Sequence, residues 1–149
     1  MFKTMGSKLF AIVGVLLFAF SLFVATITPS FSAQDTILSL AARTTTTTTS
    51  DIVKSTEKGL HFILNVTVVP GVDTITPKIQ GKDSLGNYYD VLVGSAVSTT
   101  GITVLKLSPG IATVANGAAA DILPDVYRVI ITASGSGSFT YSLTANRSN

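Results

Sequence analysis

The sequence predicts an all-β protein, an antiparallel β-sandwich of about six or seven strands preceded by an N-terminal hydrophobic helix. Two observations predict the sandwich: apolar and polar residues alternate from Leu60 onward, and turns containing Gly or Pro interrupt the alternation at short intervals. A third observation predicts the helix, because residues 9–27 form an uncharged apolar run. We therefore divide the chain into a signal peptide or transmembrane signal-anchor (1–33), a short helix with a Thr-rich connector (34–50) and a β-sandwich domain (51–149).

The N-terminal segment has the composition of a membrane-directing leader. Its apolar run is longer than that of an ordinary signal peptide and approaches the roughly 20 residues that cross a bilayer, so a retained anchor is slightly favoured over a cleaved signal. The sequence "SFSA" at residues 30–33 offers small residues for cleavage. A buried globular helix is disfavoured because the run is apolar on every face. The side chains expected to form the membrane segment are Leu9, Phe10, Val13, Leu16, Leu17, Phe18, Phe20, Leu22, Phe23 and Ile27.

Charged residues are few and unevenly placed. Lys3 and Lys8 lie ahead of the apolar run, which favours a C-terminal domain outside the cytoplasm, membrane-anchored or secreted after cleavage. Beyond the run, eight basic residues are balanced by eight acidic ones, so no basic surface for nucleic acid is expected. The chain contains no Cys, which excludes disulfides, thiolate chemistry and Cys-ligated zinc.

The segment between leader and domain is predicted in two parts. Residues 32–43, "SAQDTILSLAAR", predict a short helix, with Ser32 as N-cap and a loose apolar stripe at Ile37, Leu38 and Leu40. Six threonines follow at residues 44–49. Because Thr is β-branched and no proline is interspersed, an edge strand entering the sandwich is favoured over a flexible linker.

The domain itself is expected to contain six strands and a short seventh. They are predicted at residues 60–69, 74–82, 88–93, 102–107, 126–133 and 138–145, with the short one at 51–54. Pro77 suggests that the second is an edge strand or carries a bulge. The strand at 88–93 follows a turn around Gly86 and Asn87 and carries Tyr89, Val91 and Val93. Residues 111–124 predict a long connection with at most one helical turn.

The alternation also predicts which side chains face the core. Ile75, Pro77 and Ile79 are expected to point inward from the second strand. Phe139, Tyr141 and Leu143 are expected to do so from the last one.

No constellation of catalytic, cofactor-binding or metal-binding residues is recognised. His61, the single histidine, is expected on the polar side of its strand, without a second His or any Cys to share a metal. Asp83, Asn87 and Asp90 are close enough in sequence for a weak Ca²⁺ site, but Asp and Asn at such positions are far more often turn formers. Phosphate-binding loops and hydrolase motifs are absent from the sequence. We therefore expect no enzyme and no cofactor.

Two further patterns leave alternatives open. Tyr88 and Tyr89 could form a binding face for sugar or protein, although we favour one in the core and the other covering a sheet surface. The triplets at 65–67 and 146–148 match the N-glycosylation pattern, which we attribute to chance.

The domain resembles a group of small β proteins associated with the virions of tailed phages. The resemblance covers about residues 42–145 and lies in "ARTTTTTTSD" (42–51), "GLHFILNVTVVPGVDTITPKIQGKDSLGNYYDVL" (59–92), "TTGITVLKLSPGIA" (99–112) and "LPDVYRVIITASGSGSFTYSLTA" (123–145). It implies a virion structural role, such as head decoration or a tail or neck accessory, without catalysis or cofactor. No functional residues carry over, because the shared pattern is one of strands and turns.

Two classes of function follow from these features. The first is a non-enzymatic structural protein, exported or membrane-anchored, with a phage virion-type sandwich used for protein–protein assembly or surface display. Its expected partners are proteins, above all further copies of itself, and the membrane through residues 9–27 if the leader is retained. The alternative is a host cell-surface adhesin or pilin-like filament subunit, although the apolar run lacks the glutamate near its start that a bacterial pilin would have.

Overall fold

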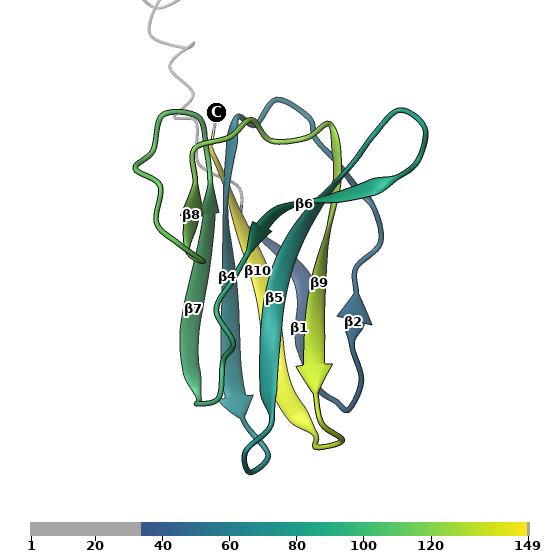
Figure 1. The fold of residues 1–149 in the computed structure, drawn as a ribbon, viewed down its shortest axis with the longest axis vertical. Helices are drawn as coiled ribbons and strands as arrows, with labels where there is room; N and C mark the ends of the chain where they lie inside the picture. The colour runs from purple at the N-terminus through teal and green to yellow at the C-terminus, as the bar shows by residue number, and fades with distance from the viewer. Residues whose placement is uncertain (1–33, 149) are drawn as a thin grey trace, which may run out of the picture. The chain divides into compact units, whose positions relative to one another are not determined.

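The structure is a computed structural model and describes residues 34–148, in which all regular structure is β (Figure 1). The strands are β1 (Gln34–Arg43), β2 (Thr47–Thr48), β3 (Ile52–Val53), β4 (Gly59–Val68), β5 (Thr74–Lys82), β6 (Tyr88–Val93), β7 (Gly101–Leu107), β8 (Ala118–Ala119), β9 (Val126–Ser134) and β10 (Phe139–Ser148). The all-β prediction is confirmed. The predicted N-terminal helix, with every residue assigned to the membrane segment, lies outside the described residues.

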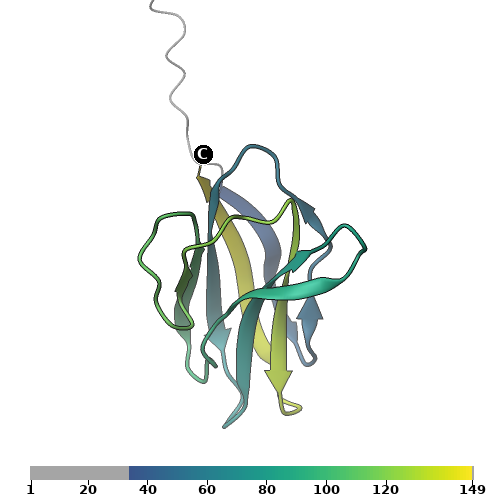
Figure 2. The same cartoon turned by 45° about the horizontal axis from the view of Figure 1, so that its top comes forward.

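The strands form two sheets that face each other (Figures 1 and 2). The first has the order β1-β10-β4-β7-β8, and the second has the order β2-β9-β5-β6 with β3 also paired to β9. All pairs are antiparallel except β7 with β8. This arrangement is consistent with a β-sandwich, and the predicted short strand at 51–54 is confirmed as β3.

One hydrophobic core joins the two sheets. The predicted inward residues of β10 are confirmed, because Phe139, Tyr141 and Leu143 are all buried. The rings of Phe62 and Tyr127 come from opposite sheets and pack edge to face, with 6.1 Å between centroids. The remaining fully buried large side chains are Leu60, Leu64, Ile75, Ile79, Leu105, Leu107, Leu123 and Ile131.

The predicted helix at residues 32–43 is wrong over its described part, which is the ten-residue strand β1. β1 pairs with β10, but its register shifts between Thr36 and Leu38 and again between Leu38 and Ala41. Each shift inserts an extra residue, so the strict alternation typical of a strand is lost from the sequence. Pairing with β10 outweighs the weak helix preference of so short a segment.

Arg43 completes the second bulge of β1. Its guanidinium donates hydrogen bonds to the carbonyl oxygens of Ser39, Ala41 and Tyr141 at 2.8, 3.1 and 2.7 Å. It also lies 4.5 Å from the centroid of the Tyr141 ring. The bulge would otherwise leave backbone acceptors of the edge strand unpaired. A bulged edge capped in this way is a poor template for pairing with another strand.

The threonine run crosses from the first sheet to the second. The predicted edge strand is confirmed at Thr47–Thr48, which pairs with β9. On either side of this pair, hydroxyl groups replace backbone acceptors: Thr46 Oγ1 accepts from the Ala133 N–H (3.3 Å) and Thr49 Oγ1 accepts from the Val129 N–H (3.0 Å). At Thr49 the backbone N–H also donates to the Val129 carbonyl (3.0 Å), so side-chain and backbone hydrogen bonds together extend the edge beyond the Thr47–Thr48 pair.

β5 is an interior strand, between β9 and β6, so of the two alternatives predicted from Pro77 the edge position is wrong. The β5–β6 pair does carry a register shift, between Ile79 and Gln80, but its pairing with β9 is regular. Its inward residues are as predicted, with Ile75, Pro77 and Ile79 buried. The Pro77 carbonyl accepts a hydrogen bond from the Gly94 N–H (2.8 Å), beyond the end of β6. In an antiparallel sheet the backbone N and O of one residue point toward the same neighbouring strand, so the Pro77 nitrogen also faces Gly94. The N–H that proline lacks would therefore not have bonded to β9, and no hydrogen bond between β5 and β9 is lost.

A bulge in β6 changes which of its residues is buried. Ile79 pairs with Leu92 whereas Gln80 pairs with Asp90, so Val91 is the extra residue. Leu92 is therefore the buried side chain of this strand, rather than Val91 or Val93. In the connection 111–124 the expected helical turn is replaced by β8, which runs beside β7.

The chain enters and leaves the domain at the same end. Gln34, at the start of β1, pairs with Asn146, near the end of β10 (Figure 1). The opposite end carries the β4–β5 and β9–β10 connections, each of which runs from one sheet to the other. They are tied together because Asp73 Oδ2 accepts a hydrogen bond from the Gly137 N–H (2.9 Å). Gly135 has a φ of 90° and packs so closely on Asp73 that a side chain there would collide with it.

Candidate interaction surfaces

The outer side of the first sheet carries no carboxylate on β10, β4 or β7. We call this surface, with the outward residues of β1, the β10 face. Its side chains are Gln34, Thr36, Leu40, Ala42, His61, Ile63, Asn65, Thr67, Ile102, Val104, Lys106, Thr140, Ser142, Thr144 and Asn146. Only His61 and Lys106 among them are titratable. The face is therefore dominated by Thr, Ser and Asn with a few aliphatic side chains.

Strand register arranges the β10 face in rows. One row runs Gln34, Asn146, His61, Lys106 and the next runs Thr36, Thr144, Ile63, Val104. In the third row Ser142, Asn65 and Ile102 are aligned, and the second bulge of β1 places Ser39 and Leu40 together opposite Ser142. Leu40 and Ile102 are 58% and 69% exposed. The two most exposed large apolar side chains of this face thus lie at opposite edges of one row.

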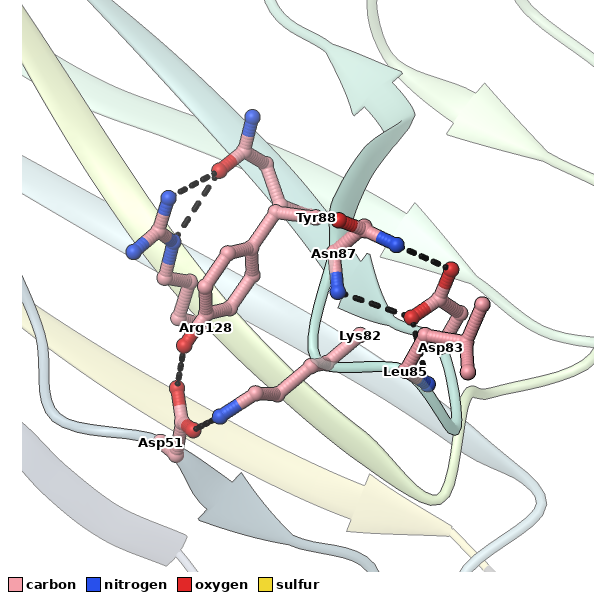
Figure 3. Close-up of polar contacts among 8 residues, drawn as sticks. Asp51, Lys82, Asp83, Leu85, Asn87, Tyr88 and Arg128 are labelled. Carbon is pink, nitrogen blue, oxygen red and sulfur yellow. Dashed lines mark hydrogen bonds and ion pairs between the residues drawn. The ribbon is translucent and has the colours of Figure 1, made fainter.

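The outer side of the second sheet is charged and internally cross-linked. The Tyr88 hydroxyl donates to Asp51 Oδ1 (2.6 Å), and the Lys82 ammonium lies 2.7 Å from Asp51 Oδ2 (Figure 3). The Arg128 guanidinium lies 3.3 Å from the centroid of the Tyr88 ring and donates from Nε and Nη2 to the Gln80 Oε1. We call these five residues the Tyr88 cluster. Strands β5, β6 and β9 and the segment before β3 each contribute to it.

Asp51 and Lys82 of the Tyr88 cluster form an ion pair. The hydrogen bond from Lys82, followed by that from Tyr88, holds the pKa of the Asp51 carboxyl below its ordinary value. The same contact with Asp51 raises the pKa of Lys82. Gln80 extends the network by donating to Asp90 (2.7 Å), whose carboxylate also pairs with Lys78 (3.0 Å). The cluster cross-links the sheet, with Lys82 paired to Asp51 and the Arg128 guanidinium held between the Tyr88 ring and the Gln80 amide oxygen.

A groove of about 680 Å³ lies between the edges of the two sheets, lined by residues 35–38 and 48–53 and by Arg147. Arg147 Nη1 donates a hydrogen bond to Glu57 Oε1 (2.8 Å). Arg147 Nε forms an ion pair with Asp35 Oδ2 at 2.7 Å, but the direction of the Nε–H bond does not allow a hydrogen bond between them. The Ser55 N–H donates to the other Glu57 oxygen (3.0 Å). The charges at the groove are thus used to join β1, β10 and the segment before β4.

Buried Glu57 remains charged at neutral pH. Burial alone would raise the pKa of its carboxyl, but hydrogen bonds from the backbone of Glu57 and Ser55 and the charge of Arg147 outweigh burial and lower the pKa from 4.5. Glu57 is 4% exposed and is the buried charged residue of the described part of the chain. Its role in this geometry is structural.

The predicted site residues are placed as follows. His61 is exposed on the outer side of β4, as expected. Asp83 accepts hydrogen bonds from the N–H groups of Leu85 and Asn87 and from the Asn87 side chain, at 2.9, 2.7 and 3.0 Å (Figure 3). These bonds use the carboxylate to form the turn, and Asp90 is directed instead at Lys78. Across residues 34–148, no three His, Cys, Asp or Glu side chains gather closely enough to hold a metal ion.

The tyrosine pair differs from the favoured prediction, because neither ring is in the core. Tyr88 is partly buried beneath Arg128, and Tyr89 is 48% exposed, with its ring against Gly81 and near Pro124. Asn65 is exposed on β4 whereas Asn146 is half-buried on β10. Between residues 34 and 148, the structure contains no helix capable of crossing a bilayer.

No local pattern in the sequence marks Arg128, Asp51 and Gln80 as partners of Tyr88. These partners are distant from Tyr88 in sequence or lie on other strands, and they meet it only through the pairing of β5 with β6 and β9. Glu57 and Arg147 carry no local signal either, because their contact depends on the position of the segment before β4 beside β10.

Comparison with protein-family models, with curated proteins and with solved structures finds no match for this chain.

Proposed function

We propose that this chain is a non-enzymatic structural protein, exported or membrane-anchored through an N-terminal hydrophobic helix. Its antiparallel β-sandwich serves protein–protein assembly or surface display of the phage-virion type. The observation that carries the proposal is the β10 face, a broad surface that bears no carboxylate on its three central strands and only two titratable side chains.

The composition of the β10 face suits contact with protein. The centres of protein interfaces are depleted in charged residues, since each buried charge must be desolvated. Thr, Ser and Asn retain hydrogen-bonding capacity at a lower desolvation cost, and Ile63, Val104 and Ile102 add apolar area. A site for a charged ligand would instead need converging unpaired charges.

The other surfaces support the same choice. The edge of β1 is bulged twice and capped by Arg43, so strand addition at that edge is disfavoured. Asp51 forms an ion pair with Lys82, and Glu57 forms one with Arg147. A catalytic role would need titratable groups free to act on a substrate, so assembly is the function that these contacts favour.

The test is the state of the full chain expressed from its gene. We expect intact mass and membrane fractionation to give an exported or membrane-bound product, and light scattering after chromatography in mild detergent to give an oligomer whose mass rises with concentration. A product that stays in the cytoplasm and is monomeric up to millimolar concentration would refute the proposal. A phage-type role further predicts co-purification with virion particles when the neighbouring genes are expressed.

A further inference from the structure

We propose that the β10 face binds the β10 face of a second copy of this chain, around a two-fold axis that runs parallel to the strands. The inference rests on the proposed assembly function and names the surface that performs it. Three features carry it: where the chain leaves the domain, how charge is distributed on the face, and where its exposed apolar side chains lie.

The position of the chain ends sets the relative direction of two copies. Gln34 pairs with Asn146, so the segment preceding Gln34 joins the domain at the end where β10 finishes (Figure 1). Copies held in one layer through residues 1–33 therefore present their strands in the same direction. Two such copies can meet face to face through a two-fold axis along the strands, which keeps each row opposite the same row of the second copy.

The charge distribution permits this contact. With the axis between β10 and β4, strand β4 lies opposite β10 of the second copy, and β7 lies opposite β1. Lys106 then faces Gln34 of the second copy instead of another Lys106, and His61 faces Asn146. Like charges are kept at opposite edges, so the face is electrostatically compatible with itself.

The exposed apolar side chains make the face self-complementary. Leu40 and Ile102 lie at the two ends of one row. The two-fold axis places Leu40 of each copy opposite Ile102 of the other. The pair therefore forms two equivalent Leu40–Ile102 contacts, which cover all four exposed side chains. Sheets packed in aligned fashion keep their strands within about 30° of each other, so the rows stay in approximate register.

The size of the face indicates a weak contact. Four strands about 4.8 Å apart and some seven residues long, at about 3.4 Å each, give an area of about 450 Å² per copy. Two such faces bury about 900 Å², below the range of about 1,200–2,000 Å² that is typical of stable complexes. We therefore expect the pair to form where anchoring in one layer raises the local concentration.

A cysteine trap in the full chain tests the geometry, because the chain has no Cys of its own. The double variant Leu40→Cys with Ile102→Cys is expressed in full, left in its membrane or in detergent micelles, and treated with a short bismaleimide. A cross-linker is used because facing sheets lie about 10 Å apart, whereas the Cα atoms of a disulfide lie only about 4.4–6.8 Å apart. Both positions are exposed, so folding should be retained. Within one copy the two positions are three strand spacings apart, about 14 Å. A link within one copy leaves a monomer on the gel, so any dimer band joins two copies.

We expect the double variant to be mostly covalent dimer on a non-reducing gel. Each single variant should give at least fivefold less covalent dimer, because the two-fold axis holds Leu40 of one copy away from Leu40 of the other, and likewise for Ile102. The matched control is Leu40→Cys with Ile122→Cys, since Ile122 is 72% exposed but lies outside the β10 face. It should give no more dimer than Leu40→Cys alone.

The outcomes separate this inference from the proposed function. Equal cross-linking by single variants and by the control would indicate random encounter and overturn the two-fold contact. An oligomer by light scattering that the double variant fails to cross-link would overturn the contact but leave the assembly function standing. A chain that is monomeric by light scattering and never cross-links would overturn both.

Discussion

Substitution of Glu57 by Gln tests how much the buried ion pair stabilises the fold. Glu57 is 4% exposed and accepts hydrogen bonds from Arg147 at one oxygen and from the Ser55 N–H at the other. Gln has the same shape but one acceptor and no charge. Its NH₂ group would therefore face one of the two donors, and one of these hydrogen bonds would be lost.

The expected loss follows from these contacts. A hydrogen bond that involves a charged group contributes about 1.5–3 kcal/mol. Arg147 is 23% exposed and keeps its contact with Asp35, so the lower half of the range applies and we expect a loss of about 2 kcal/mol. For a domain of this size that loss lowers the Tm by roughly 6–10 °C. Thermal unfolding of the full chain, followed by circular dichroism at pH 7, measures it.

The loss should depend on pH in one direction. The pKa of Glu57 is lower in the folded protein than its ordinary value of 4.5, so the carboxylate contributes stability above pH 4.5. This contribution is lost as the pH falls through the folded pKa. The gap in Tm between the original protein and the Gln variant should therefore be full at pH 7 and shrink as the pH is lowered below 4.5.

A matched substitution at the surface controls for the general effect of removing an acid. Asp121 is exposed, and its carboxylate accepts a hydrogen bond from the Ile122 N–H. Asp121→Asn should change stability by no more than about 0.5 kcal/mol. The reasoning is refuted if Glu57→Gln unfolds at the same temperature as the original protein at pH 7, or if its deficit is as large at pH 3 as at pH 7.

Two further substitutions test the hydroxyl contacts of the threonine run. Thr49→Val removes the acceptor of the Val129 N–H and should lower the free energy of unfolding, measured in urea, by about 1–2 kcal/mol. The control Thr48→Val, at an exposed neighbouring position, should change it by no more than about 0.5 kcal/mol. Equal effects of the two substitutions would contradict a specific role for the Thr49 hydroxyl. Tyr141→Phe removes the hydrogen bond that the buried Tyr141 hydroxyl donates to Thr47 Oγ1, and it should lower the free energy of unfolding at pH 7 by about 0.5–1.5 kcal/mol. A variant as stable as the original protein would show that this hydrogen bond contributes nothing to stability.

Local alternation was sufficient to predict the long central strands. β4 and β10 read directly from the sequence because a strand buried on one side repeats every two residues, whatever it pairs with. The same argument identified the inward faces of β5 and β10. The turn at Asp83 was also predictable, since the Asp side chain that forms it bonds to N–H groups two and four residues away.

Tertiary pairing decided what the local pattern could not. β1 reads as a weak helix because two bulges break its alternation, and only β10, about a hundred residues further along the chain, makes it a strand. The bulge in β6 likewise exchanged Val91 for Leu92 in the core. Such irregularities depend on the partner strand, which the sequence of the bulged strand does not specify.

Composition and hydrophobic period are local properties of the chain, and they were enough to predict the class of fold, the central strands and the absence of cysteine chemistry. The tertiary structure decided which residues meet. Arg128 stacks on Tyr88, and Leu40 shares a row with Ile102, only because of the register between strands. Register is set by the packing of whole sheets around the core, so a surface assembled from several strands becomes visible only in the folded domain.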